Sequence, residues 1–201
     1  MRSDLKKMLG AFCMAGMLLC PMLAHADSID VNVRPGGGGY YDDDEYTHFT
    51  WGIGLGGAVL GDGFGSAYSA GYGLDGNVGI KVDRNLAFLL AVDSYIFNTT
   101  YSGVYNGEVN FMPSIRVSFG GHDVKPYFIV GAGLNDNIAY YQDFYGTEYT
   151  NAVNPVVGGG VGIAFRVAHK LDIYVQGKYE DVLASGGNFS YFPIAIGVQF
   201  N

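Results

Sequence analysis

Cysteine, charge and long apolar runs are all scarce in this sequence. Its 201 residues include two cysteines, Cys13 and Cys20, and only 15% of them are charged. No segment after residue 26 reaches the ~18 consecutive apolar residues that a membrane-spanning helix needs. If the protein enters a membrane, it must therefore do so as strands. Both cysteines lie within residues 1–26, and no cysteine follows. The fold after residue 26 therefore has no disulfide and must depend on hydrogen bonding and packing.

Residues 1–26 have the three parts of a secretory signal peptide, namely a basic start, an apolar middle and a small-x-small cleavage motif. These parts are Arg2, Lys6 and Lys7, then residues 8–23, then Ala24-His25-Ala26. Cleavage after Ala26 would remove both cysteines, three of the 11 Lys+Arg and one of the 19 Asp+Glu. The remaining 8 basic against 18 acidic residues give a net charge of −10, which argues against nucleic acid as a partner.

The next segment, 27–47, reads as a flexible, acidic, Gly-rich periplasmic lead. It contains Pro35, four consecutive glycines at 36–39 and an acidic run at 42–45. The acidic run lacks the alternating ligand spacing and central glycine of a calcium loop, so we predict neither a metal nor another cofactor here.

From His48 onward, apolar and polar residues alternate. Residues 171–180, LDIYVQGKYE, are an example: Leu171, Ile173 and Val175 share one phase, while Asp172 and Lys178 share the other. This period of two predicts β-strands. Eight such segments occur, around 49–59, 68–82, 86–93, 108–119, 127–135, 153–167, 171–180 and 191–200.

The links between these segments alternate in length. Short turns are expected at 83–85, 120–125 and 168–170, and longer loops around 60–67, 98–107, 135–152 and 181–190. Short periplasmic turns with long external loops are typical of outer-membrane barrels. We therefore predict an all-β fold, an eight-stranded antiparallel up-and-down transmembrane β-barrel spanning 48–201.

The apolar phase carries no charge in any of the eight segments and has aromatic residues towards both ends. This pattern is typical of a lipid-facing surface, and it disfavours a soluble lipocalin-like barrel, whose apolar face would line a cavity. The charged phase should then be enclosed, with opposite signs paired. The predicted interior polar network comprises Asp75, Lys81, Asp93, Glu108, Arg116, Arg166, Asp172, Lys178 and Glu180.

Three stretches, KPYFIVGAGL (125–134), QGKYED (176–181) and FPIAIGVQF (192–200), resemble the small outer-membrane barrels of the OmpA/OmpX-like superfamily. The resemblance covers 48–201 and includes no peptidoglycan-binding domain. It implies outer-membrane lipid and lipopolysaccharide as surroundings and the barrel-assembly machinery as a partner in biogenesis. Gly197, Val198 and Phe200 resemble the terminal assembly signal, although Asn201 follows the aromatic residue that usually ends the chain.

Several functions remain open for such a barrel. A structural or surface-interaction role without catalysis is our first expectation. An adhesin or ligand-binding role would use the aromatic residues of the 135–152 loop, which are Tyr140, Tyr141, Phe144, Tyr145 and Tyr149. These aromatics could instead extend the outer girdle or touch lipopolysaccharide sugars.

Two further alternatives are a narrow gated pore and a lipid A-modifying enzyme. Eight strands rarely leave an open channel, because side chains fill the interior. An enzyme would need a base, but His48, His122 and His169 all fall at the turn end of the predicted barrel. The carboxylates Asp143 and Glu148 are the remaining candidates, and their ordinary explanation is solvation in a loop.

Overall fold

The computed structural model describes residues 47–61, 68–99, 104–120, 123–143, 146–168 and 170–201. The predicted signal peptide and all but the last residue of the predicted lead lie outside these ranges. The strands are β1 (His48–Leu60), β2 (Tyr68–Lys81), β3 (Leu86–Thr99), β4 (Val104–Ser118), β5 (Val124–Asp143), β6 (Gly146–Ala168), β7 (Leu171–Val182) and β8 (Phe189–Phe200).

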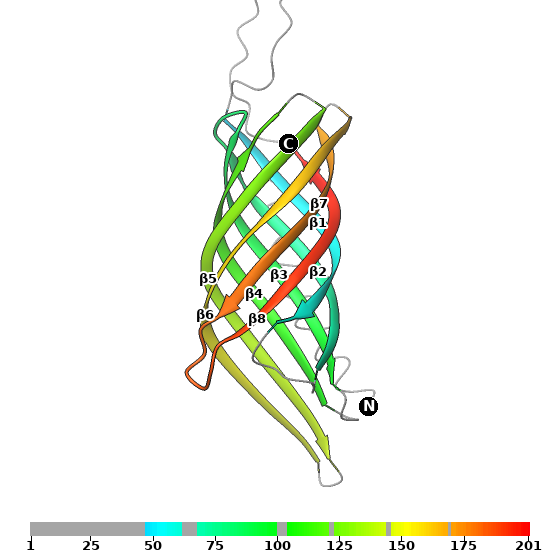
Figure 1. Cartoon of the computed structure of the whole chain (residues 1–201), viewed down its shortest axis with the longest axis vertical. Coiled ribbons are helices and arrows are strands. Elements are labelled where there is room, and N and C mark those ends of the chain that lie inside the picture. The colour runs from blue at the N-terminus through cyan, green and yellow to red at the C-terminus, as the bar shows by residue number, and fades with distance from the viewer. Residues whose placement is uncertain (1–46, 62–67, 100–103, 121–122, 144–145, 169) are drawn as a thin grey trace, which may run out of the picture. The chain divides into compact units, whose positions relative to one another are not determined.

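Each strand pairs antiparallel with the next, and β1 also pairs with β8, so the sheet closes into a barrel (Figure 1). Closure pairs the backbone groups of the barrel wall, which a sheet needs in order to stand in lipid. The predicted eight-stranded all-β barrel is confirmed. In the described ranges, no helix is long and apolar enough to cross a bilayer.

The two faces of the barrel follow the predicted alternation. On β7, Asp172, Tyr174, Gln176, Lys178 and Glu180 are buried inside, whereas Ile173, Val175 and Tyr179 are exposed outside. The same division holds on β3, whose pattern in the sequence was the least polar: Ala87, Leu89 and Ala91 face inward. The exposed surface is thus aliphatic and aromatic, as in a lipid-facing barrel.

Aromatic pairs stand at both ends of the outer surface. At the turn end, Trp51 stacks on Phe200 with ring centroids 4.2 Å apart, and Phe119 contacts Phe128 edge-on. Towards the other end, the rings of Tyr179 and Phe192 lie 5.0 Å apart. These pairs join neighbouring strands at the levels where girdle residues meet the membrane interfaces.

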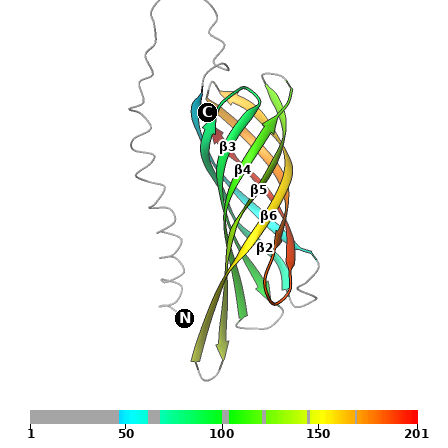
Figure 2. The same ribbon diagram turned by 90° about the vertical axis from the view of Figure 1, so that its left-hand side faces the viewer.

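The structure corrects the predicted loop at 135–152. β5 continues to Asp143 and β6 begins at Gly146, with an unbroken register from Val124↔Phe165 to Asp143↔Gly146. Alternation in this stretch is masked by polar residues on both faces, because the hairpin extends beyond the apolar band of the barrel. Figures 1 and 2 show it projecting past the other strands. The predicted loop at 98–107 is also shorter, since β3 ends at Thr99 and β4 begins at Val104.

Inward glycines allow neighbouring strands to approach closely. A Cβ atom at Gly133 would lie 2.0 Å from the carbonyl oxygen of Phe111 on the adjacent strand. At Gly177, which is on the outward face of β7, a Cβ would meet nothing within 4 Å. The first glycine is therefore required by backbone packing, and the second is not.

We expect Gly133→Ala to destabilise the barrel by about 1–3 kcal/mol, the usual cost of overpacking, because backbone atoms would have to move. Gly177→Ala is the matched control and should leave stability unchanged. The measurement is denaturant unfolding in detergent, followed by the heat-dependent gel shift of the folded barrel. Equal stability of the two variants would contradict the assigned packing.

Candidate functional site: an enclosed polar network and a protruding hairpin

One ammonium group lies among three carboxylates in the barrel interior. Lys178 Nζ is 3.1 Å from Asp75 Oδ2 and 3.1 Å from Glu180 Oε1, and it also contacts Asp93 Oδ2. All four side chains are at most 2% exposed. A buried carboxylate or ammonium is costly unless it is paired, so these four groups stabilise one another as a set.

The strand register brings these groups together. Asp75 on β2 and Asp93 on β3 are directly opposite partners, and both side chains point inward. Lys178 and Glu180 are two residues apart on β7, and therefore lie on the same inner face. The consecutive strands β2 and β3 thus converge with the distant β7 on one charge cluster.

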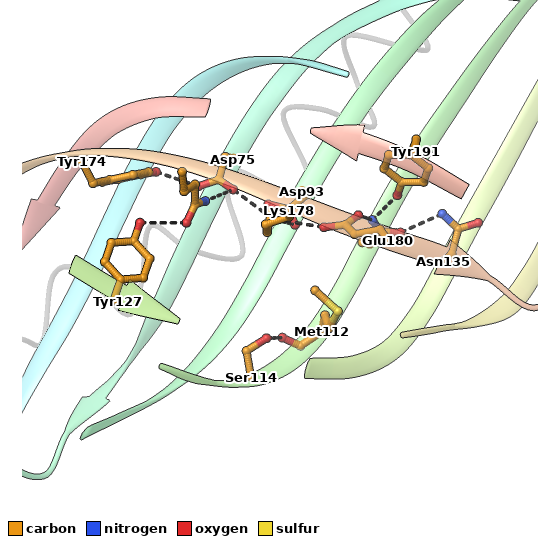
Figure 3. Close-up of polar contacts among 12 residues, drawn as sticks. Asp75, Asp93, Met112, Ser114, Tyr127, Asn135, Tyr174, Lys178, Glu180 and Tyr191 are labelled. Carbon is orange, nitrogen blue, oxygen red and sulfur yellow. Dashed lines mark hydrogen bonds and ion pairs between the residues drawn. The ribbon is translucent and has the colours of Figure 1, made fainter. Parts of the chain in front are cut away.

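Hydrogen bonds extend this cluster in both directions (Figure 3). Towards the turn end, the Tyr174 hydroxyl donates to Asp75 Oδ1 at 2.6 Å, and Gln176 Nε2 donates to Asp75 Oδ2 at 2.7 Å. The Tyr127 hydroxyl in turn donates to Gln176 Oε1 at 3.0 Å. Towards the hairpin end, Asn110 Nδ2 donates to Glu180 Oε2 at 2.5 Å and also contacts the Tyr191 hydroxyl.

Glu108 is held by amides instead of a cation. Asn135 Nδ2 donates to its Oε2 at 2.7 Å, while Asn106 and Asn137 donate to its Oε1 at 3.0 and 2.5 Å. Among the described residues, no lysine, arginine or histidine forms an ion pair with it. Asn135 also donates to Asn110 Oδ1, which joins this group to the central cluster.

The turn end of the interior is rich in cationic groups. Arg166 Nε is 3.0 Å from Asp172 Oδ1, and Asn201 Nδ2 donates to Asp172 Oδ2 at 2.8 Å. Arg116 donates to Gln199 Oε1 and lies over the ring of Tyr127, 5.4 Å from its centroid. Lys81, Arg116, Lys125 and Asp172 help to line a cavity of about 20 Å³, which has room for a water molecule.

An apolar cluster fills the interior beyond the charges, towards the hairpin end. Tyr95, Phe97 and Tyr191 are at most 1% exposed, and the ring of Tyr191 meets those of Tyr95 and Phe97 edge-on. Phe189 and Val182 belong to the same cluster. Packed rings across the interior obstruct the path that an open pore would need.

The predicted interior residues all lie on the inner face, but they form separate groups. Asp75, Asp93, Lys178 and Glu180 meet in the centre, Arg166 and Asp172 pair at the turn end, and Glu108 stands with the asparagines. Lys81 and Arg116 line the turn-end cavity. In the described ranges, no group of three or more His, Cys, Asp or Glu residues could hold a metal ion.

Sequence reasoning missed several members of the network. Lys125 was expected in a turn, yet it is only 7% exposed in the interior. Asn106 was expected in the 98–107 loop, and Phe97 lay outside the predicted strand at 86–93, because the strands around them were predicted too short. Continuing the alternation of β3 past Asp93, through Tyr95 to Phe97, would have placed both aromatics inside.

The projecting hairpin leaves one strand edge open. β4 accompanies β5 as far as Tyr141, but β7 reaches β6 only to Val156. Residues 146–154 of β6 therefore have a partner strand on one side only among the described strands. The side chains of the predicted loop-binding residues Tyr140, Tyr141, Phe144, Tyr145 and Tyr149, and those of Asp143 and Glu148, lie outside the described part.

The direction of the backbone groups on this edge follows from one hydrogen bond. The Leu183 amide donates to the Pro155 carbonyl at 2.9 Å, so residue 155 directs its backbone groups to the β7 side. Because the register with β5 has no bulge, residues 147, 149, 151 and 153 direct theirs the same way, where the partner strand has ended. These groups form the open edge of β6.

The predicted assembly-signal residues Gly197, Val198 and Phe200 all lie in β8, the strand that closes the barrel. Phe200 and Val198 pair with Trp51 and Ile53 of β1. Recognition of this segment by assembly machinery stays a prediction.

No family model and no curated protein matches the chain. Solved structures do match it. Neisserial surface protein A aligns with 78% of this chain and 99% of its own at 19% identity, with a TM-score of 0.60. Ail of Yersinia pestis, solved with the heparin analogue sucrose octasulfate, covers 77% and 99% at 13% identity, with a TM-score of 0.51. OprG of Pseudomonas aeruginosa covers 78% and 96% at 9% identity, also at 0.51.

These structures establish the fold. The chain has the architecture of the small eight-stranded outer-membrane barrels, as the OmpA/OmpX-like resemblance predicted. Sequence identities this low give no information about a ligand or partner, so function must be argued from this chain's own residues.

Replacing Lys178 with methionine should destabilise the folded barrel by about 3–5 kcal/mol, because three buried carboxylates would lose their shared ammonium. Lys170→Met, in an exposed turn, is the matched control. Unfolding by guanidinium in detergent measures both. A Lys178→Met barrel as stable as the control would show that the cluster contributes nothing to stability.

Proposed function

We propose that this protein is an integral outer-membrane barrel, exported by the signal peptide 1–26, with a non-catalytic surface-interaction role. In this proposal the β5–β6 hairpin binds an extended segment of an external partner along the open edge of β6. The single observation that carries the proposal is that edge, which projects beyond the other strands.

The end of the barrel that bears the hairpin would face outward. Short turns of such barrels are periplasmic, and here 82–85 and 119–123 link strands at the end that also holds the C-terminus (Figure 1). The hairpin projects from the opposite end. The exposed aliphatic belt between the two ends would contact lipid, and lipopolysaccharide would surround the base of the hairpin.

The open edge lacks the features that normally protect an edge strand. Lysine, proline and bulges are the usual means of preventing strand addition. Residues 147–154, TEYTNAVN, contain neither lysine nor proline, and the register with β5 is regular. Backbone groups on such an edge can pair with an extended peptide, which is the recognition mode called β-augmentation.

The partner segment should carry positive charge. Asp136, Asp143 and Glu148 lie on the two hairpin strands, and the described sequence from 135 to 154 has no lysine or arginine. Complementary charge would speed association and fix the partner's register. The hairpin tyrosines could alternatively contact lipopolysaccharide sugars. That interaction would involve their side chains and not the backbone groups of the open strand edge.

The interior supports neither of the remaining alternatives. A pore would have to pass the packed rings of Tyr95, Phe97 and Tyr191. An enzyme at the outer end would lack a histidine, because His48 opens β1 at the turn end and the sequence has none at 49–121, 123–168 or 170–201.

Asn151→Pro removes one backbone donor from the open edge, whereas Asn151→Ala keeps it. We expect extended basic peptides, selected from a displayed library on the reconstituted barrel, to bind Asn151→Pro about fivefold more weakly, the effect of one hydrogen bond of ~1 kcal/mol. Asn151→Ala should bind like the wild type. Binding is measured by surface plasmon resonance on barrels shown to be folded by their gel shift.

Deleting 138–149 extends this test. The shortened barrel should fold and lose peptide binding, because the edge is removed but the wall remains. Equal binding by the proline and alanine variants, or binding that survives the deletion, would refute strand addition. A library that yields no peptide for the wild-type barrel would do the same.

A further inference from the structure

The central cluster holds more negative than positive charge. Asp75, Asp93 and Glu180 face a single ammonium, Lys178, so three carboxylates are set against one cation in a site where every side chain is at most 2% exposed. A buried excess of this kind is costly, and proteins remove it by binding a counter-ion or a proton.

Asp75 and Asp93 are close enough to share a proton. They are directly opposed across β2 and β3, where Cβ atoms are about 4.5–5.5 Å apart, and both carboxyl groups contact the same Lys178 ammonium. Two ionised carboxylates in this position would repel, whereas a carboxylic acid beside a carboxylate forms a hydrogen bond.

The hydrogen-bond donors are distributed unequally between the two acids. Asp75 receives hydrogen bonds from Tyr174 and Gln176 in addition to Lys178, as a carboxylate requires. Asp93 has Lys178 on Oδ2, and its buried Oδ1 has no hydrogen-bond partner in the described part of the chain. Asp75 is therefore suited to the ionised form and Asp93 to the protonated one.

Tyr95 is a second, independent feature of the site. It is wholly buried, lies two residues after Asp93 on the same inner face of β3, and its hydroxyl has no hydrogen-bond partner among the described residues. The charges of Asp93, Lys178 and Asp75 act on this hydroxyl, so it lies near the cluster. A fully buried hydroxyl without a partner is rare in native proteins.

We propose that Asp93 and Asp75 form a proton-binding site that retains one proton at neutral pH, carried on Asp93 and shared with Asp75. The proton reduces the net charge of the cluster from −2 to −1 and turns a repulsive pair into a hydrogen bond. Six titratable side chains from four strands surround the site: Tyr95 on β3, Tyr127 on β5, Tyr174, Lys178 and Glu180 on β7, and Tyr191 on β8.

The proton links folding to pH. An unfolded aspartate titrates near ~3.9, so the unfolded chain releases this proton at neutral pH while the folded barrel keeps it. The unfolding equilibrium constant should then rise about tenfold per pH unit between about pH 5 and about pH 7, so the barrel becomes less stable as pH rises.

Asp93→Asn tests the site, because an amide keeps the shape and donates a hydrogen bond without binding a proton. We expect its unfolding equilibrium constant to lose this pH dependence. Asp172→Asn, which removes a buried acid paired with Arg166, is the matched control and should retain it. A pH dependence as steep in Asp93→Asn as in the wild type overturns the proposal, as does stability set by Na⁺ or K⁺ concentration at constant ionic strength.

Infrared spectroscopy gives a readout that does not depend on a variant folding. Wild-type barrel with ¹³C-labelled aspartate, at neutral pH in detergent, should show the C=O stretch of a protonated carboxylic acid. The absence of that band overturns the proposal. Where Asp93→Asn folds, the band should disappear from its spectrum, and its persistence there places the proton elsewhere and also overturns the assignment.

Discussion

The contact of Lys178 with Asp75, Asp93 and Glu180 is the interaction on which the barrel interior depends. Eight strands enclose too little space for bulk water, so each charge that faces inward must find its partner there. The register of β2, β3 and β7 supplies those partners, and the amides around Glu108 and the Arg166–Asp172 pair satisfy the two ends. Inward glycines make this possible, since long polar side chains need small neighbours on the adjacent strands.

The barrel wall and the hairpin differ in whether the backbone groups of their strands are paired on both sides. In the wall, closure of β1 on β8 pairs both sides of every strand, as a lipid environment requires. Beyond the wall, β6 runs on without its β7 neighbour, and its backbone groups on that side have no partner strand among the described strands. An open edge is unfavourable in lipid but tolerable in water, so its position past the wall agrees with an aqueous location and with a role in binding.

Much of this arrangement was predictable from the period of two. Strand number, antiparallel order and the inward set from Asp75 to Glu180 follow from alternation, because neighbouring residues must point to opposite faces. Which inward groups would meet was not predictable, since pairing depends on register: Glu108 and Lys178 share a face, yet Glu108 is bound by Asn135. The hairpin was mistaken for a loop because, outside the apolar band, both faces of a strand meet water and alternation fades. The inward position of Lys125 was missed for a related reason. Alternation does not show where a strand ends when the residues at the boundary are polar.

The most direct test of this account asks which side of the sheet meets hydrocarbon. Val175 lies midway along β7 on the exposed face, between inward Tyr174 and Gln176. In the Val175→Cys barrel reconstituted into lipid vesicles, a water-soluble maleimide should fail to label the thiol until detergent or denaturant is added. Rapid labelling in intact vesicles, or a mature protein that dissolves as a stable monomer without detergent, would contradict the account.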